Sequence, residues 1–218
     1  MTDLYIRSNT NTLLASGNNG RREVEGTRDG ALFTAGETLK WALQGRLFVA
    51  NFGTVTTPLT FLVTAANRPD AVLRVPSGTT IIPLVWETVL EAAAGTATEL
   101  DIRIANNDIG SSTSSAASVG PINLRNDAPV VSAVTARQLY TADATTEVTP
   151  VSIHRVTWPL AQASGLKEYT DYWRPAVGTG GILIGPASLE AFLAATTTQA
   201  TGYMQVIWAE LPSSYVTG

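Results

Sequence analysis

The sequence predicts an all-β fold, a jelly-roll-like β-sandwich preceded by an extended N-terminal arm. Roughly eight to ten short apolar stretches are separated by Gly, Pro, Asn and Asp turn signals, a spacing typical of sandwiches and barrels. Several of these stretches alternate between apolar and polar side chains, as half-buried strands do. Tight turns are mixed with long loops, and a jelly roll requires long crossings between its two sheets.

The composition describes a folded chain with very few charges. The 218 residues include no cysteine, so disulfides and thiolate sites are excluded together. Hydrophobic residues make up 44% of the chain and charged residues only 15%, against about 25% in typical soluble domains. Two facing sheets bury part of this apolar surface, and we expect neighbouring subunits to bury the rest.

Residues 1–30 differ from the rest and predict an N-terminal arm or extended loop. They are rich in Asn, Gly, Thr and Arg and contain few apolar anchors. Such a segment becomes ordered against a partner, although a frayed terminus has the same composition. We expect residues 31–218 to form a single β-sandwich domain, because neither flank of the Ser-rich stretch 106–120 has the composition of a separate domain.

The first strands follow the arm. The predicted strands are Leu39–Leu43, whose alternation is imperfect, Arg46–Ala50, Leu59–Thr64 and Ala71–Val75. In the next one, 79–91 (TTIIPLVWETVLE), Leu84, Trp86, Thr88 and Leu90 share one face, while Val85, Glu87, Val89 and Glu91 share the other. Pro83 has no N–H to donate, so we expect it at a sheet edge or a bulge.

The second half of the domain continues the pattern. In Glu99–Ala105, Leu100, Ile102 and Ile104 are predicted to point inward and Asp101 and Arg103 outward. Further strands are predicted at Pro121–Leu124, Val130–Tyr140, Val148–Trp158, Ile182–Ile184 and Tyr203–Glu210. Ser188–Ala195 is compatible with either a short helix or a strand.

The sequence offers little for catalysis, and we expect no enzyme, no cofactor and no metal site. His154 is the only histidine, and no G-x-S-x-G elbow supplies a nucleophile. Asn106–Asp108 and Asn126-Asp127 are better explained as Asx turns than as calcium loops. The glycine-rich residues 178–181 lack the Lys-Ser/Thr that completes a phosphate-binding loop.

An aromatic segment is the best candidate for a contact surface. Trp158, Tyr169, Tyr172 and Trp173 lie close together in the sequence, and exposed aromatic side chains anchor protein interfaces or stack on sugars. The alternative is that they fill the core or one end of the sandwich. The basic pair Arg21 and Arg22 is a second candidate for the interface.

The charge distribution argues against nucleic acid and membrane partners. The net charge is −4 and lysine occurs only twice, whereas nucleic-acid surfaces need clustered Lys and Arg. The longest apolar run, Ile81–Trp86, is far too short to span a bilayer. The N-terminus has no basic stretch followed by an apolar one, so no secretion signal is expected.

Three segments resemble viral structural proteins of the single jelly-roll type. They are residues 75–84 (VPSGTTIIPL) continuing to Glu91, residues 119–129 (VGPINLRNDAP), and residues 202–210 (GYMQVIWAE). The likeness extends from Leu32 to Leu211. Such proteins are capsid or capsid-decorating proteins of bacteriophages and small icosahedral viruses. The resemblance implies a virion protein made in a host cytoplasm and assembled as a homo-oligomer, typically a trimer.

Within this class, the arm favours a cement or decoration protein bound to the major capsid protein of a phage. A shell-forming capsid protein, the alternative, often carries a basic arm for the genome. Here the arginines of the arm are offset by Asp3, Glu23, Glu25 and Asp29. A receptor- or carbohydrate-binding sandwich is a second alternative, and it would use the aromatic segment.

Overall fold

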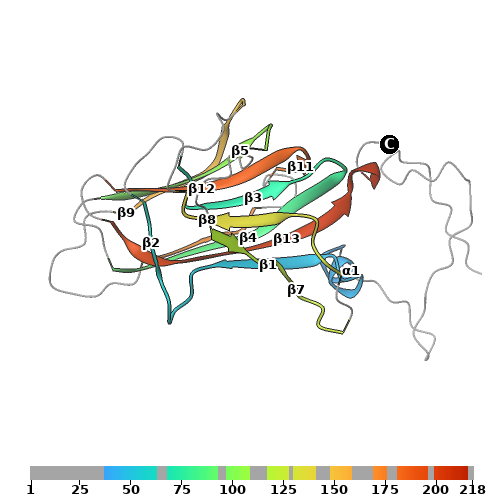
Figure 1. The fold of residues 1–218 in the computed structure, drawn as a ribbon, viewed down its shortest axis with the longest axis horizontal. Coiled ribbons are helices and arrows are strands. Elements are labelled where there is room, and N and C mark those ends of the chain that lie inside the picture. Colours follow the sequence, from blue (N-terminus) through green and yellow to red (C-terminus); the bar gives the residue numbers. More distant parts are fainter. Residues whose placement is uncertain are drawn as a thin grey trace, which may run out of the picture.

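The computed structural model describes residues 37–62, 68–92, 97–108, 117–127, 130–140, 148–158, 169–175, 181–195 and 199–215. These residues form two stacked antiparallel sheets (Figure 1). The predicted arm, with Arg21 and Arg22, lies outside the described residues. The all-β sandwich class is confirmed.

The first sheet, called the β1 sheet, contains seven strands. Its main path runs β10 (Tyr169–Trp173), β4 (Thr79–Ala92), β13 (Thr201–Pro212), β1 (Leu47–Phe52) and β7 (Ile122–Asn123), with β11 (Leu183–Ile184) beside β4 and β2 (Leu59–Thr60) beside β13. A short helix, α1 (Glu37–Leu43), precedes β1, and a 3-10 turn, η3 (Ser213–Tyr215), follows β13.

The second sheet, called the β12 sheet, contains six strands. Its order is β6 (Ala117–Val119), β8 (Thr135–Gln138), β3 (Ala71–Val75), β12 (Ala187–Ala195), β5 (Thr98–Ala105) and β9 (Val151–Trp158). Residues 188–195, compatible from sequence with a helix or a strand, form most of strand β12 because they are hydrogen-bonded between β3 and β5.

The pairing of the long strands is that of a jelly roll. β1 pairs with β13, β3 with β12, β4 with β10, and β5 with β9, always antiparallel. Each early strand thus pairs with a late one, in nested order, as in a long hairpin rolled into two sheets. The predicted jelly-roll-like architecture follows directly from this topology.

Alternation along the strands builds the core between the sheets. On β4, Trp86, Thr88 and Leu90, which the alternation places on one face, are buried. Trp86 stacks on Phe52, and Trp208 stacks on Phe48, with ring centroids 6.3 and 6.0 Å apart. Burying a large apolar side chain stabilises a fold by about 1.5–3 kcal/mol, so these two pairs are major anchors of the β1 sheet.

Pro83 lies beside an irregularity, as its missing N–H predicted. The register between β4 and β13 shifts at this point, with Trp208 opposite Pro83 but Ile207 opposite Val85. Leu84 is therefore the extra residue of a bulge. The partners of β4 on its other side, β10 and β11, pair with residues 86–90 and 80–81 and so leave Pro83 unpaired there.

The strand predicted at Leu39–Leu43 is wrong, because these residues belong to helix α1. Helix α1 ends at this point because Gly45 adopts a positive φ of 66°. Its N–H donates to Ala42 O, and Arg46 N–H donates to Trp41 O. This is a Schellman end, which closes a helix through a left-handed glycine.

Candidate interaction surface

The predicted aromatic segment divides between the core and the surface. Trp158, at the end of β9, is only 7% exposed and joins the core. Trp173 on β10 packs against that core from the edge. Tyr172 points to solvent and is 47% exposed, with the Arg174 guanidinium 4.5 Å above its ring. The side chain of Tyr169 lies outside the described residues. Trp158 and Trp173 therefore do not form an exposed platform with Tyr172.

His154 links the two sheets at their open edge. Its Nε2 lies 2.8 Å from Asp171 Oδ2, across from β9 to β10. The imidazole also stacks on Trp173, with centroids 5.7 Å apart. On β9, His154 stands opposite Ile102, a core residue, so its ring closes the edge of the core. Among the described residues, no group of three His, Asp or Glu side chains could hold a metal ion.

The outer face of the β12 sheet satisfies its charges internally. Asp101, predicted to point outward, does so but is only 7% exposed because Ser152, Arg103 and Arg155 cover it. Ser152 Oγ donates to one carboxylate oxygen, and Arg103 Nε and Arg155 Nη2 donate to the other at 2.7 and 2.9 Å. Burial alone would raise the pKa of Asp101, but these hydrogen bonds outweigh it and hold the pKa below its usual value.

A hollow of about 260 Å³ lies beside this cluster. Its lining includes three guanidinium groups and three carboxyl groups: Arg68, Arg103, Arg155, Asp70, Glu99 and Asp101. Asp70 accepts hydrogen bonds from the backbone N–H groups of Leu62 and Leu193, both at 2.7 Å. Burial nevertheless raises the pKa of Asp70 to about 7. The balanced lining does not favour a ligand of either charge.

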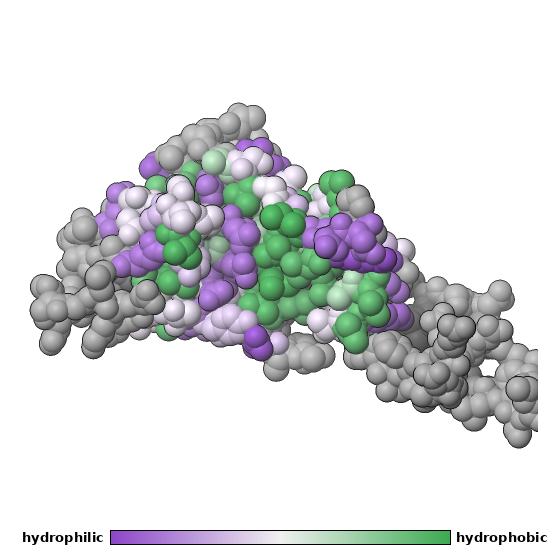
Figure 2. Space-filling view, turned by 90° about the horizontal axis from the view of Figure 1, so that it is seen from below, coloured by the Kyte–Doolittle hydropathy of each residue, from purple (hydrophilic) through white to green (hydrophobic). Residues whose placement is uncertain are grey.

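The outer face of the β1 sheet is aliphatic. Ile122, Val49, Ile207 and Val85 stand side by side across β7, β1, β13 and β4. The next row, nearer to α1, is Leu47, Ala209 and Ile82. We call these seven residues the apolar face. Figure 2, which views the molecule from the side of β1 and β7, shows a continuous apolar area. Ile122, at its edge, is 57% exposed, Ile82, Val85 and Ile207 are half-buried, and Leu47, Val49 and Ala209 are buried, with at most 7% exposure.

A polar row borders the apolar face on the side away from α1. Asn51, Gln205, Glu87 and Tyr172 are paired across β1, β13, β4 and β10. Gln205 Nε2 donates to Asn51 Oδ1 at 2.7 Å. The border therefore carries hydrogen-bond donors, acceptors and one exposed aromatic ring.

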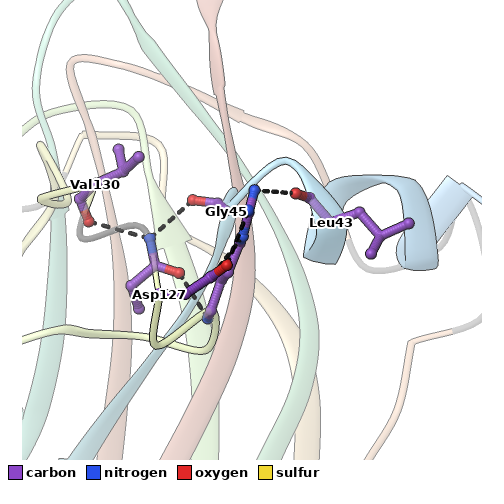
Figure 3. A network of polar contacts seen from close by, with 6 residues as sticks. Leu43, Gly45, Asp127 and Val130 are labelled. Atoms are coloured by element: carbon purple, nitrogen blue, oxygen red, sulfur yellow. Dashed lines mark hydrogen bonds and ion pairs between the residues drawn. The ribbon is translucent and has the colours of Figure 1, made fainter.

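A corner beside β7 extends the apolar face toward α1 (Figure 3). Asn123 Nδ2 donates to the carbonyls of Gly45 and Val130 at 2.9 and 3.1 Å. Arg125 Nη1 donates to Leu43 O at 2.5 Å, while its Nε and Nη2 bind Asp127 at 2.7 and 3.1 Å. The four apolar residues held at this corner are between 48% and 86% exposed: Leu43, Leu124, Val130 and Val131. We call these four the apolar corner.

The amino-acid sequence does not reveal the apolar face as a unit. The residues come from four strands far apart in the chain, and only the register of the sheet aligns them. The alternation on β4 did assign Val85 to the side opposite Trp86. That assignment and the low charge content are the two features of the sequence that point to this surface.

No protein-family model, no curated protein and no solved structure matches this chain. Among the described residues, no helix has the length and apolar character needed to cross a membrane.

Proposed function

We propose that this protein is a structural component of an assembly, in its most specific form a trimeric cement or decoration protein that stabilises a phage capsid. The observation that carries the proposal is the apolar face of the β1 sheet, together with its apolar corner. A face of aliphatic side chains in cross-strand register gains free energy when another surface covers it.

The chemistry of the remaining surface supports a binding role over a catalytic one. His154 is engaged with Asp171 and Trp173 at the edge of the core. Asp101 is saturated by donors from its own sheet. The jelly-roll topology agrees with the resemblance to virion proteins, although the same architecture hosts many functions. The apolar face also agrees with a shell-forming capsid protein, in which every copy is covered by neighbours.

A receptor- or carbohydrate-binding module is the second candidate. The polar row favours it, because Tyr172 stands beside Glu87, with the amides of Gln205 and Asn51 in the same line. An exposed ring next to amide and carboxylate groups is a usual lining of a sugar site. The inward packing of Trp158 and Trp173 weakens this second candidate, because the ring of Tyr172 alone makes a small platform for stacking on a sugar.

The test is the mass of the full chain in solution, measured by light scattering after size-exclusion chromatography over a wide concentration range. We expect a stable species of three times the 23.0 kDa chain mass. Closed particles in electron micrographs would favour the shell-forming role over the cement role. A monomer at every concentration contradicts self-assembly, and a glycan array would then test the second candidate.

A further inference from the structure

We infer that a second copy of this chain covers the apolar face and the apolar corner, with the exposed Ile122 and the half-buried Ile207 at the centre of the contact. The inference rests on the proposed function, since it names the partner and the surface of the assembly. Three features carry it: the size of the face, the distribution of its charges, and the mixed signs on its border.

The size of the face suits a contact between subunits. Its strands β4, β13, β1 and β7, together with β10, are spaced about 4.8 Å apart, so the sheet is roughly 19 Å wide. From Leu47 to the level of Tyr203 it is about 20 Å long, at about 3.4 Å per residue. This flat area of roughly 400 Å², which includes the polar row as well as the apolar face, is about half of the ~800 Å² that each partner contributes to a typical stable interface. The most exposed aliphatic side chains of the contact are Ile122 and the four residues of the apolar corner, which are 48% to 86% exposed.

The centre of the face contains no charged side chain. All seven residues of the apolar face are Ile, Val, Leu or Ala. The polar row lies beyond them, with Asn51, Gln205 and Glu87. Depletion of charge at the centre and a polar border are what distinguish protein interfaces from other surfaces. A flat face of this kind also lacks the concavity of a small-molecule site.

The border has both signs of charge, which favours a copy of the same chain as the partner. Glu87 on β4 stands opposite Tyr172 on β10, and Arg174 lies over the Tyr172 ring. A carboxylate and a guanidinium therefore lie on neighbouring strands of the border. A second copy offers the matching guanidinium and carboxylate, whereas a nucleic acid offers only negative charge.

The absence of cysteine allows a direct test in the full chain. A single thiol is introduced by Ile122→Cys on the apolar face or by Val151→Cys on β9, positions that are both 57% exposed. In the oligomer, we expect alkylation of the Ile122→Cys thiol to slow by roughly ten-fold or more relative to diluted monomer, because the interface excludes water. The Val151→Cys thiol is the matched control, with a rate independent of concentration.

A charge substitution gives a second readout. Ile207→Glu puts a carboxylate at the centre of the contact, and we expect the dissociation constant of the oligomer to rise by about 100-fold or more. Thr157→Glu, at an exposed position of β9, is the control and leaves the mass unchanged. Circular dichroism and thermal melting verify that both variants fold.

The outcomes separate the inference from the proposed function. A wild-type monomer at all concentrations contradicts the proposed assembly itself. A wild-type oligomer whose Ile122→Cys thiol reacts as fast as in the monomer, or whose affinity survives Ile207→Glu, overturns only the assignment of this surface to a second copy. Protection of Ile122→Cys together with dissociation by Ile207→Glu supports both.

Discussion

The outer faces of the two sheets differ sharply, although both sheets supply the same core. On the β12 sheet, acidic side chains are matched within the chain, with Asp101 bound by Ser152, Arg103 and Arg155. Arg74 and Asp108 form a second pair there, joined at 2.6 Å. On the β1 sheet, the corresponding positions are aliphatic. One outer face thus carries ion pairs formed within the chain, and the other carries aliphatic side chains, which is why we propose the second as the contact surface.

The largest expected effect is a pH dependence arising from Asp70, a buried residue that lines the hollow beside the Asp101 cluster. The folded chain holds the Asp70 proton up to about pH 7, whereas the unfolded chain releases it near pH 4. The free energy of unfolding therefore falls as pH rises through this window, by roughly 3 kcal/mol between pH 5 and pH 8. Urea denaturation at both pH values measures it, and Asp70→Asn is the control that removes the dependence. Equal slopes against pH in the two proteins would contradict the role of Asp70.

The second largest effect is expected from replacing Asp101, the acceptor at the centre of the charged cluster. Asp101→Ala leaves Arg103 and Ser152 without their shared acceptor in a partly buried site. We expect the free energy of unfolding to fall by about 2–3 kcal/mol, below the full cost of breaking a buried pair because the partners remain partly solvated. Chemical denaturation measures the change. The oligomer mass should stay that of the wild type, and dissociation would show that the β12 sheet also takes part in assembly.

The outermost member of that cluster should matter far less. The side chain of Arg155 is 61% exposed, against 10% for Asp101, and exposed ion pairs add little because water screens them. Arg155→Ala should therefore shift the denaturation midpoint much less than Asp101→Ala does. A comparable loss for the two variants would mean that Arg155 shields Asp101 from water in addition to pairing with it.

The smallest effect on folding is expected for a substitution on the outer face of the β1 sheet. Ile122→Thr exchanges one β-branched side chain for another at a position 57% exposed, so the free energy of unfolding of the monomer should change by less than about 0.5 kcal/mol. The same substitution should weaken the proposed oligomer. The melting temperature at low concentration reports the effect on folding, and the mass at high concentration reports the effect on the oligomer. A lower melting temperature without a change in mass would contradict the contrast drawn between the two outer faces.

Sequence reasoning predicted the elements whose alternation is regular. On β5, the predicted inward positions Leu100 and Ile102 are buried as expected, because a period of two leaves one consistent assignment. The helix at residues 37–43 was missed because seven residues give too short a pattern, and Gly45 determines its end through backbone conformation. Residues 188–195 stayed ambiguous because their side chains are almost all apolar, a pattern that suits a buried strand as well as a helix.

The candidate surface was less predictable than the fold. Trp158 and Trp173 lie near Tyr172 in the sequence, but strand geometry turns Trp173 toward the core and Tyr172 toward solvent. Val49 and Ile207 are 158 positions apart in numbering yet directly opposite in the sheet. Such a row depends on register, and a shift of one residue would replace it with core side chains.

The nested pairing of early and late strands determines when the apolar face can form during synthesis. β13 is the last of the described strands in chain order and lies between β1 and β4. Until the ribosome has released it, β1 and β4 have no common neighbour and Ile207 is missing from its row. Contacts this distant in sequence also form slowly. A nascent chain therefore cannot present the complete apolar face until β13 has been synthesised and has paired with β1 and β4.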